Sequence, residues 1–137
     1  MPESESDTIR HILQTYRIIA TVGLSSDEDK PAYKVPDYLH SHGYHIIPVN
    51  PGLGEALGEK AYASLSDIPE PVEVVQIFLR SERVGPVVDE AIAIGAKVVW
   101  MQLGIKDEDA AARARAAGLE VVMNQCMKIQ HKIMTRG

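Results

Sequence analysis

The chain has 137 residues, 45% of them hydrophobic and 24% charged, which is the length and composition of one globular domain with a real core. Its net charge of −5 argues against a general role in binding nucleic acid. The single cysteine, Cys126, excludes an internal disulfide and a CxxC metal site. The start is acidic and polar and no apolar run reaches membrane length, so we expect a soluble, cytoplasmic protein without a signal peptide or a membrane span.

Five short apolar strands are expected to alternate with amphipathic helices. Residues 1–6 are predicted to be disordered, and residues 7–137 to form a single domain. The expected strands are 18–22, 45–49, 73–79, 97–102 and 120–123. The expected helices are 7–15, one from Pro31 to a stop at Gly43, one that begins at Ser81 or Pro86 and ends at Gly95, one from a cap at Asp107 to Gly118, and 128–136. Pro36 either kinks the second helix or moves its regular part toward Lys34.

This alternation predicts an α/β protein, namely a three-layer α/β/α Rossmann-like domain around a five-stranded parallel sheet. Counting strands along the chain, we assign the order 3-2-1-4-5. Ligands of such sheets bind at the carboxyl ends of the strands, where the strand order reverses. This order places the reversal between strands 18–22 and 97–102, so that the segments 23–25 and 102–104 face one another.

The turn after the first strand has features of an anion site. Gly23 opens a polar loop that leads into the helix beginning at Pro31, and backbone N–H groups at such a turn can bind phosphate. Ser25 adds a hydroxyl, and Lys30 and Lys34 add positive charge. The same residues also fit an ordinary strand–helix turn with solvated lysines, and the turn by itself leaves both interpretations open.

A dinucleotide site of the G-x-G-x-x-G kind fits poorly. The loop beginning at Gly23 contains one glycine, and the second strand ends at Asn50 without an acid for the ribose. A phosphate-bearing nucleotide other than NAD(P) is therefore favoured.

Several ordered motifs resemble the small stand-alone CoA-binding proteins of bacteria and archaea, which are similar to the N-terminal CoA-binding domain of the succinyl-CoA synthetase α-subunit. The resemblance covers roughly residues 9–132. The matching motifs are V-G-L-S-x5-P-A-Y-x-V at 22–35, I-P-V-N-P at 47–51, W-x-Q-x-G-I at 100–105 and the closing segment 124–131.

The resemblance implies a coenzyme A site along the carboxyl ends of the strands. It implies Gly23, Leu24 and Ser25 at the phosphates, Lys30, Pro31, Ala32 and Tyr33 at the phosphate and nucleotide end, Val49, Asn50 and Pro51 beside the adenosine, Phe78, Leu79 and Arg80 as the next wall, and Gln102, Leu103, Gly104 and Ile105 along the pantetheine. Lysines, a helix N-terminus and a mostly apolar wall suit a polyanion with a long amphipathic arm.

Two segments depart from the family pattern. The family commonly has Arg-Pro-Ser where this chain has residues 30–32, and a lysine lacks the bidentate fork of an arginine. The closing motif often reads Asp-Arg-Cys, and here residues 124–126 are Asn-Gln-Cys. We expect these changes to affect affinity more than fold.

No catalytic residue and no metal ligand is assigned. Cys126 fits a buried small hydrophobe better than a nucleophile, and His40, His42 and His45 lack the spacing of a metal site. The similar synthetase carries its phosphorylated histidine in a second domain, which we do not expect here.

We therefore expect binding of CoA or an acyl-CoA without independent catalysis. The alternatives are a component of a CoA ligase that needs a partner chain, an NAD(P)-binding oxidoreductase, and a CoA-responsive regulatory module. A homodimer or an unidentified protein partner is left open.

Overall fold

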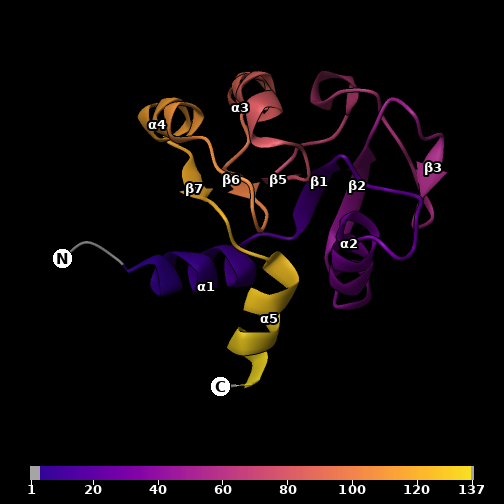
Figure 1. Ribbon diagram of the computed structural model, residues 1–137, viewed down its shortest axis with the longest axis horizontal. Helices are drawn as coiled ribbons and strands as arrows, with labels where there is room; N and C mark the ends of the chain where they lie inside the picture. The colour runs from indigo at the N-terminus through magenta and orange to yellow at the C-terminus, as the bar shows by residue number, and fades with distance from the viewer. Residues whose placement is uncertain (1–3, 137) are drawn as a thin grey trace.

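A five-stranded parallel sheet separates two layers of helices in the computed structural model, which describes residues 4–136 (Figure 1). The strand order is β2-β1-β5-β6-β7. The strands are β1 Ile18–Val22, β2 His45–Val49, β5 Val74–Ile77, β6 Val98–Met101 and β7 Glu120–Val122, and every neighbouring pair is parallel. The predicted α/β Rossmann-like class is confirmed.

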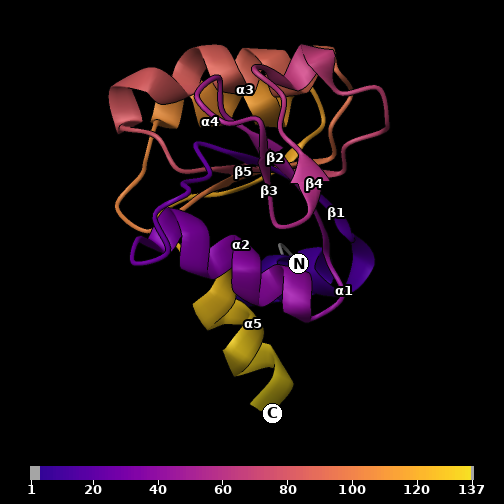
Figure 2. The same cartoon turned by 90° about the vertical axis from the view of Figure 1, so that its right-hand side faces the viewer.

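The helices form one layer on each face of the sheet (Figure 2). Helices α3 Val84–Ala93 and α4 Glu108–Ala116 cover one face, and α1 Glu5–Thr15, α2 Pro31–Ser41 and α5 Met127–Arg136 cover the other. Successive strand residues alternate between the two layers, as the pleat requires. Thus Ile19 packs in the apolar cluster of α1, α2 and α5, whereas Ala20 packs in the cluster of α3 and α4.

The predicted strand order is wrong. In the structure β5, the third long strand along the chain, lies between β1 and β6 instead of outside β2. The order reverses between β1 and β5, so Gly23 faces the end of β5 and not residues 102–104. This arrangement buries all four residues of β5, three of them apolar and one the polar Gln76, as expected of a central parallel strand covered on both faces.

A short segment around Tyr62 lies at the outer edge of β2, beside the end of that strand. Tyr62 forms a parallel bridge to Val49, donates its N–H to the Pro48 carbonyl at 3.0 Å and accepts from the Asn50 N–H at 2.8 Å. A hairpin of β3 Glu55–Ala56 and β4 Glu59–Lys60 precedes it. These contacts leave no room beside β2 for a further strand.

The hairpin was not predicted, because the residues of its turn are unusual for this turn type. Leu57 and Gly58 both have positive φ, 52° and 76°, as the two-residue turn of type I′ requires. Leucine rarely adopts this conformation, so the dipeptide lacks the Asn-Gly signal that marks such turns.

Helix α1 begins earlier than predicted. Of the segment expected to be disordered, residues 1–3 lie outside the described range, whereas Ser4 caps the helix by accepting the Asp7 N–H on its hydroxyl at 3.1 Å. Glu5 is the first helical residue, so the predicted start at Asp7 is two residues late.

Pro36 lies inside α2 without ending it. Proline has no N–H to donate, so the carbonyl of Ala32, four residues earlier, is left without its helical partner. The Ser25 N–H donates to that carbonyl at 3.2 Å. The proline therefore allows the loop after β1 to be fastened to the first turn of α2.

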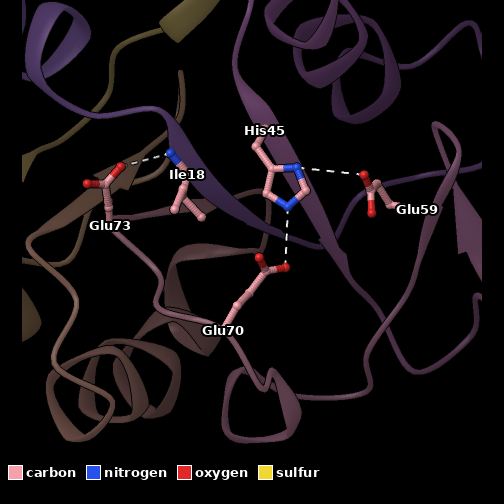
Figure 3. A network of polar contacts seen from close by, with 5 residues as sticks. All are labelled: Ile18, His45, Glu59, Glu70 and Glu73. Carbon is pink, nitrogen blue, oxygen red and sulfur yellow. Dashed lines mark hydrogen bonds and ion pairs between the residues drawn. The ribbon is translucent and has the colours of Figure 1, made fainter.

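Charged side chains close the amino edge of the sheet (Figure 3). Glu73 Oε1 accepts the backbone N–H groups of Arg17 and Ile18 at 2.9 and 3.0 Å. The His45 ring lies between two carboxylates, with Nδ1 3.6 Å from Glu59 and Nε2 3.3 Å from Glu70. This edge is thereby held together by its own polar groups.

None of the helices described within residues 4–136 combines the length and the apolar character needed to cross a membrane.

Candidate functional site

A glycine turn begins the carboxyl edge of the sheet. Gly23 follows β1 directly with φ +86°, and its N–H donates to the Val49 carbonyl at 2.8 Å. A Cβ atom at this position would lie 2.3 Å from the Phe78 carbonyl oxygen, well inside van der Waals contact. Only glycine allows the chain to pass this close to the end of β5.

The loop after Gly23 is tied to its neighbours on both sides. Asn50, which follows β2, donates from Nδ2 to the Leu24 carbonyl at 2.9 Å and accepts the Gly52 N–H on Oδ1 at 2.8 Å. The Ser25 N–H is committed to α2, and its hydroxyl oxygen accepts the Asp27 N–H at 3.0 Å. These hydrogen bonds fix the conformation of the loop. The hydroxyl hydrogen of Ser25 stays available to donate to a ligand.

Three hollows adjoin at this edge. The polar hollow, about 490 Å³, is lined by Gly23, Ser25, Ser26, Lys30, Ala32, Asn50, Gly52, Leu53 and Phe78. The apolar hollow, about 610 Å³, is lined by Lys30, Pro31, Ala32, Phe78, Leu79, Arg80, Gln102, Leu103, Ile105, Cys126 and Ile129. The rear hollow, about 540 Å³, is lined by Val22, Gly23, Val49, Asn50, Pro51, Ala63, Phe78, Leu79, Arg83 and Val87. Phe78 lines all three, which makes the end of β5 the centre of the site.

The structure gathers all but three of the predicted site residues around these hollows. Leu24 is instead fully buried in the core, and Tyr33 lines none of the three. Gly104 also lies outside them, and its N–H donates to Asn124 Oδ1 at 2.7 Å. Whether the lining residues bind a ligand stays a prediction.

Some lining residues were missed by sequence reasoning. Arg83 and Val87 belong to the segment after β5, and they reach the rear hollow because β5 is the neighbour of β1. The predicted strand order placed this segment away from β1, so these two residues were not expected at the site. Ile129 was also missed, and it reaches the apolar hollow from the first turn of α5, a position set by the tertiary packing of that helix. Cys126, directly before α5, lines the same hollow, as its place after the last predicted strand allows.

The lining carries positive charge without a compensating acid. Lys30, Arg80 and Arg83 line the hollows, and the three sets of lining residues contain no aspartate, glutamate or histidine. The acidic run 27–29 is exposed on the outer part of the loop and lines none of them. At Tyr33, desolvation and then the charges of Asp37 and Glu28 raise the pKa of the phenol above its usual value.

A buried polar chain forms the floor beneath the apolar hollow. Thr21 Oγ1 donates to Gln76 Oε1 at 2.8 Å, and Gln76 Nε2 donates to Gln102 Oε1 at 3.1 Å. Gln102 Oε1 also accepts the Met127 N–H at 3.0 Å, which joins the sheet to the first residue of α5. Such a satisfied network fixes the orientation of Gln102, which is buried and lines the hollow.

Helix α5 is fastened to α2 by an aromatic cluster. Tyr38 Oη lies 2.8 Å from His131 Nδ1, and the Tyr38 ring stacks on His42 with centroids 4.0 Å apart. His131 is buried, and desolvation, followed by the charges of His42 and Arg17, lowers the pKa of its imidazole. We assign the neutral ring with Nδ1 accepting from the tyrosine hydroxyl. This contact positions the helix that carries Ile129 and begins directly after Cys126.

Two further features bear on the choice of site. No cluster of three or more histidine, cysteine or acidic side chains in the described chain could hold a metal ion. A hollow of about 550 Å³ also lies beside α1 and β7, lined by residues such as Glu5, His11 and Arg115, but it contains none of the predicted site residues.

Comparison with known proteins found a matching family and similar chains. The CoA binding domain family matches residues 17–132. The uncharacterized protein YneT of Bacillus subtilis is 40% identical over 125 residues, which are 91% of this chain and 93% of YneT. The structure of a hypothetical protein from Pyrococcus horikoshii superposes with a TM-score of 0.92 at 40% identity, covering 98% of this chain and 99% of that one.

A larger enzyme contains a related region. The ADP-forming acetate–CoA ligase II of Archaeoglobus fulgidus is 31% identical over 93 residues, which are 66% of this chain and 14% of the ligase. The similarity therefore concerns one part of that enzyme. Since the family match spans most of its length, this chain belongs to the CoA binding domain family.

Proposed function

We propose that this protein binds coenzyme A at the carboxyl edge of the sheet and does not catalyse a reaction by itself. The nucleotide and its phosphates occupy the polar and rear hollows, and the pantetheine arm lies along the apolar hollow. The observation that carries the proposal is the continuity of the hollows around Phe78, with Lys30 and Arg80 on their lining. A polar pocket that opens into an apolar one suits a ligand with an anionic head and a long, weakly polar arm.

The composition of the lining supports binding without catalysis. Cys126 contributes a thiol to the apolar hollow, and no histidine or carboxylate lines the same hollow to act as its base. Phosphoryl or acyl transfer would thus need groups from another chain. We expect the purified protein to form no ATP from acetyl-CoA, ADP and phosphate, measured by a luciferase assay.

Isothermal titration with CoA tests the proposal directly, with NAD and NADP titrated in parallel. We expect saturable CoA binding that Lys30→Ala weakens about tenfold, because a lysine–phosphate contact is charge-assisted. Lys34→Ala is the matched control, since Lys34 is one turn further along α2, is exposed and lines none of the hollows. No CoA binding at millimolar ligand by the folded protein would overturn the proposal, as would tighter binding of NAD or NADP.

A second candidate function is that of the CoA-binding part of a ligase completed by a partner chain. The identity with the acetate–CoA ligase favours it. Affinity capture from the native organism with and without CoA, followed by a ligase assay of the eluate, would distinguish it. ADP-forming ligase activity that elutes with the protein supports this function, and its absence removes it.

A further inference from the structure

We propose that the preferred ligand of this site is an acyl-CoA with an apolar acyl chain of medium length, and that the chain lies along Leu103, Ile129 and Ile133. The inference rests on the proposed CoA site and adds the class of ligand. We name these three side chains the apolar stripe.

The apolar stripe is exposed where polar side chains would be expected. Leu103, Ile129 and Ile133 are 64%, 49% and 56% exposed, and they are the large hydrophobic side chains that stand out as exposed in the described chain. Leu103 and Ile129 line the apolar hollow. Ile133 follows Ile129 by four residues in α5, so it lies one turn further along the same helix face. The stripe therefore starts inside the hollow and continues beyond it.

The strand order gives the direction of the ligand. The polar hollow lies over the ends of β1 and β2, Phe78 follows β5, and Leu103 follows β6, the next strand of the sheet. A ligand whose phosphates lie in the polar hollow would thus extend across β5 toward Leu103 and α5. Its thiol end would then reach Cys126 and Ile129, where the stripe leaves the hollow.

The chemistry of the stripe indicates what lies on it. A free thiol would leave Ile129 and Ile133 in contact with water, whereas a saturated chain attached to that thiol would cover them. The cations of the same hollow, Lys30 and Arg80, complement the phosphates of a ligand and would be buried without a partner by a flat apolar protein surface. An anionic ligand with an apolar tail satisfies both features at once.

The test is a titration series with CoA, acetyl-CoA and octanoyl-CoA below the micellar concentration of the last. We expect CoA and acetyl-CoA to bind alike within about twofold and octanoyl-CoA to bind about tenfold more tightly, because the chain is covered only on one side. In Ile133→Ser the advantage of octanoyl-CoA over CoA should fall to about threefold. Lys132→Ser is the matched control, because it changes the neighbouring residue of the same helix, which contacts the Tyr38 ring instead. All three ligands carry the CoA phosphates, so the loss of the lysine charge cancels in the ratio.

The outcomes separate this inference from the proposed function. Equal affinity for all three ligands would overturn the proposed preference for an acyl chain and would leave the proposed CoA site intact. No binding of any of them overturns the CoA site itself. A wild-type dimer that Ile133→Ser dissociates in analytical ultracentrifugation, together with no advantage for octanoyl-CoA, would assign the stripe to self-association and contradict the inference.

Discussion

The two edges of the sheet use polar groups in opposite ways. At the amino edge, Glu73 binds two backbone N–H groups and His45 lies between Glu59 and Glu70. At the carboxyl edge, Lys30 and Arg80 line open hollows, and neither forms an ion pair with any described residue.

The contrast indicates that polar groups able to interact with a ligand are left at the carboxyl edge and not at the amino edge. Polar groups that satisfy one another close an edge and add modest stability. Cations without partners beside an apolar wall leave interaction energy for a ligand. The predictions below change one edge at a time, so that effects on stability and on binding can be separated.

The largest effect is expected at the glycine turn of the carboxyl edge. Gly23→Ala should lower the free energy of unfolding by about 3 kcal/mol, because it adds a left-handed φ penalty to a clash with the Phe78 carbonyl. It should also weaken CoA binding, since the turn and the end of β5 must move apart. Urea denaturation and calorimetry measure the two effects.

Gly43→Ala is the matched control for this change. Gly43 has φ +92°, but no atom lies within 4 Å of its Cβ position, so about 1 kcal/mol of backbone strain is expected and no change in CoA affinity. Equal losses in the two variants would show that the close approach to Phe78 is unimportant.

A smaller loss is expected from the buried floor of the carboxyl edge. Gln76→Leu leaves the Thr21 hydroxyl without its acceptor and should cost about 2 kcal/mol in unfolding free energy. Adding Thr21→Val removes the stranded group and should recover part of the loss, which a double-mutant cycle measures. Strictly additive losses would contradict a network that acts as a unit.

The docking of α5 should make stability depend on pH. The pKa of His131 is lowered in the folded protein, so the unfolded chain binds the proton more readily. The contribution of the neutral His131 ring to the free energy of unfolding is therefore fully present above the ordinary histidine pKa of about 6.5. It is lost as the pH falls from there toward the lower pKa of His131 in the folded protein. Urea titrations between about pH 5 and 8 should show this slope, and His131→Gln should reduce it. His40→Gln, which changes an exposed histidine of α2, should leave the slope unchanged.

The smallest effect is expected at the amino edge. His45→Gln removes two partly exposed contacts between the imidazole and carboxylates and should change the unfolding free energy by no more than about 0.5 kcal/mol. CoA affinity should stay at the wild-type value, because none of these side chains lines the hollows. A clear loss of CoA binding in a stable His45→Gln protein would break the division between the two edges.

The pattern of residues was sufficient to predict the long strands and the α-helices, apart from some of their boundaries. The short apolar runs predicted β1 and β2 with the same first and last residues as in the structure. Asp107 caps α4 by accepting the Ala110 N–H, as predicted. Ser81 does not cap α3. Its hydroxyl accepts the Lys106 N–H, and a short 3-10 turn, Ser81–Arg83, precedes the helix.

The site was predictable to the extent that it is local. Residues just after β1, β2, β5 and β6 must meet at one edge because the strands are parallel, whatever their order. Leu24 and Gly104 do not line the hollows. The Leu24 side chain is buried in the core, and the Gly104 N–H donates to Asn124 Oδ1. The spacing of the sequence predicts neither contact.

By itself, the sequence determined the α/β class and the glycine turn, which follow from periodicity and from φ preferences. It also predicted a site at the carboxyl edge, from the common direction of parallel strands. Only the tertiary structure decided that β5 lies beside β1, because competing strand orders bury similar apolar runs and differ in long-range contacts. The bridge of Tyr62 to β2 and the Thr21–Gln76–Gln102 chain are such contacts. They join residues far apart in the chain, and no local pattern encodes them.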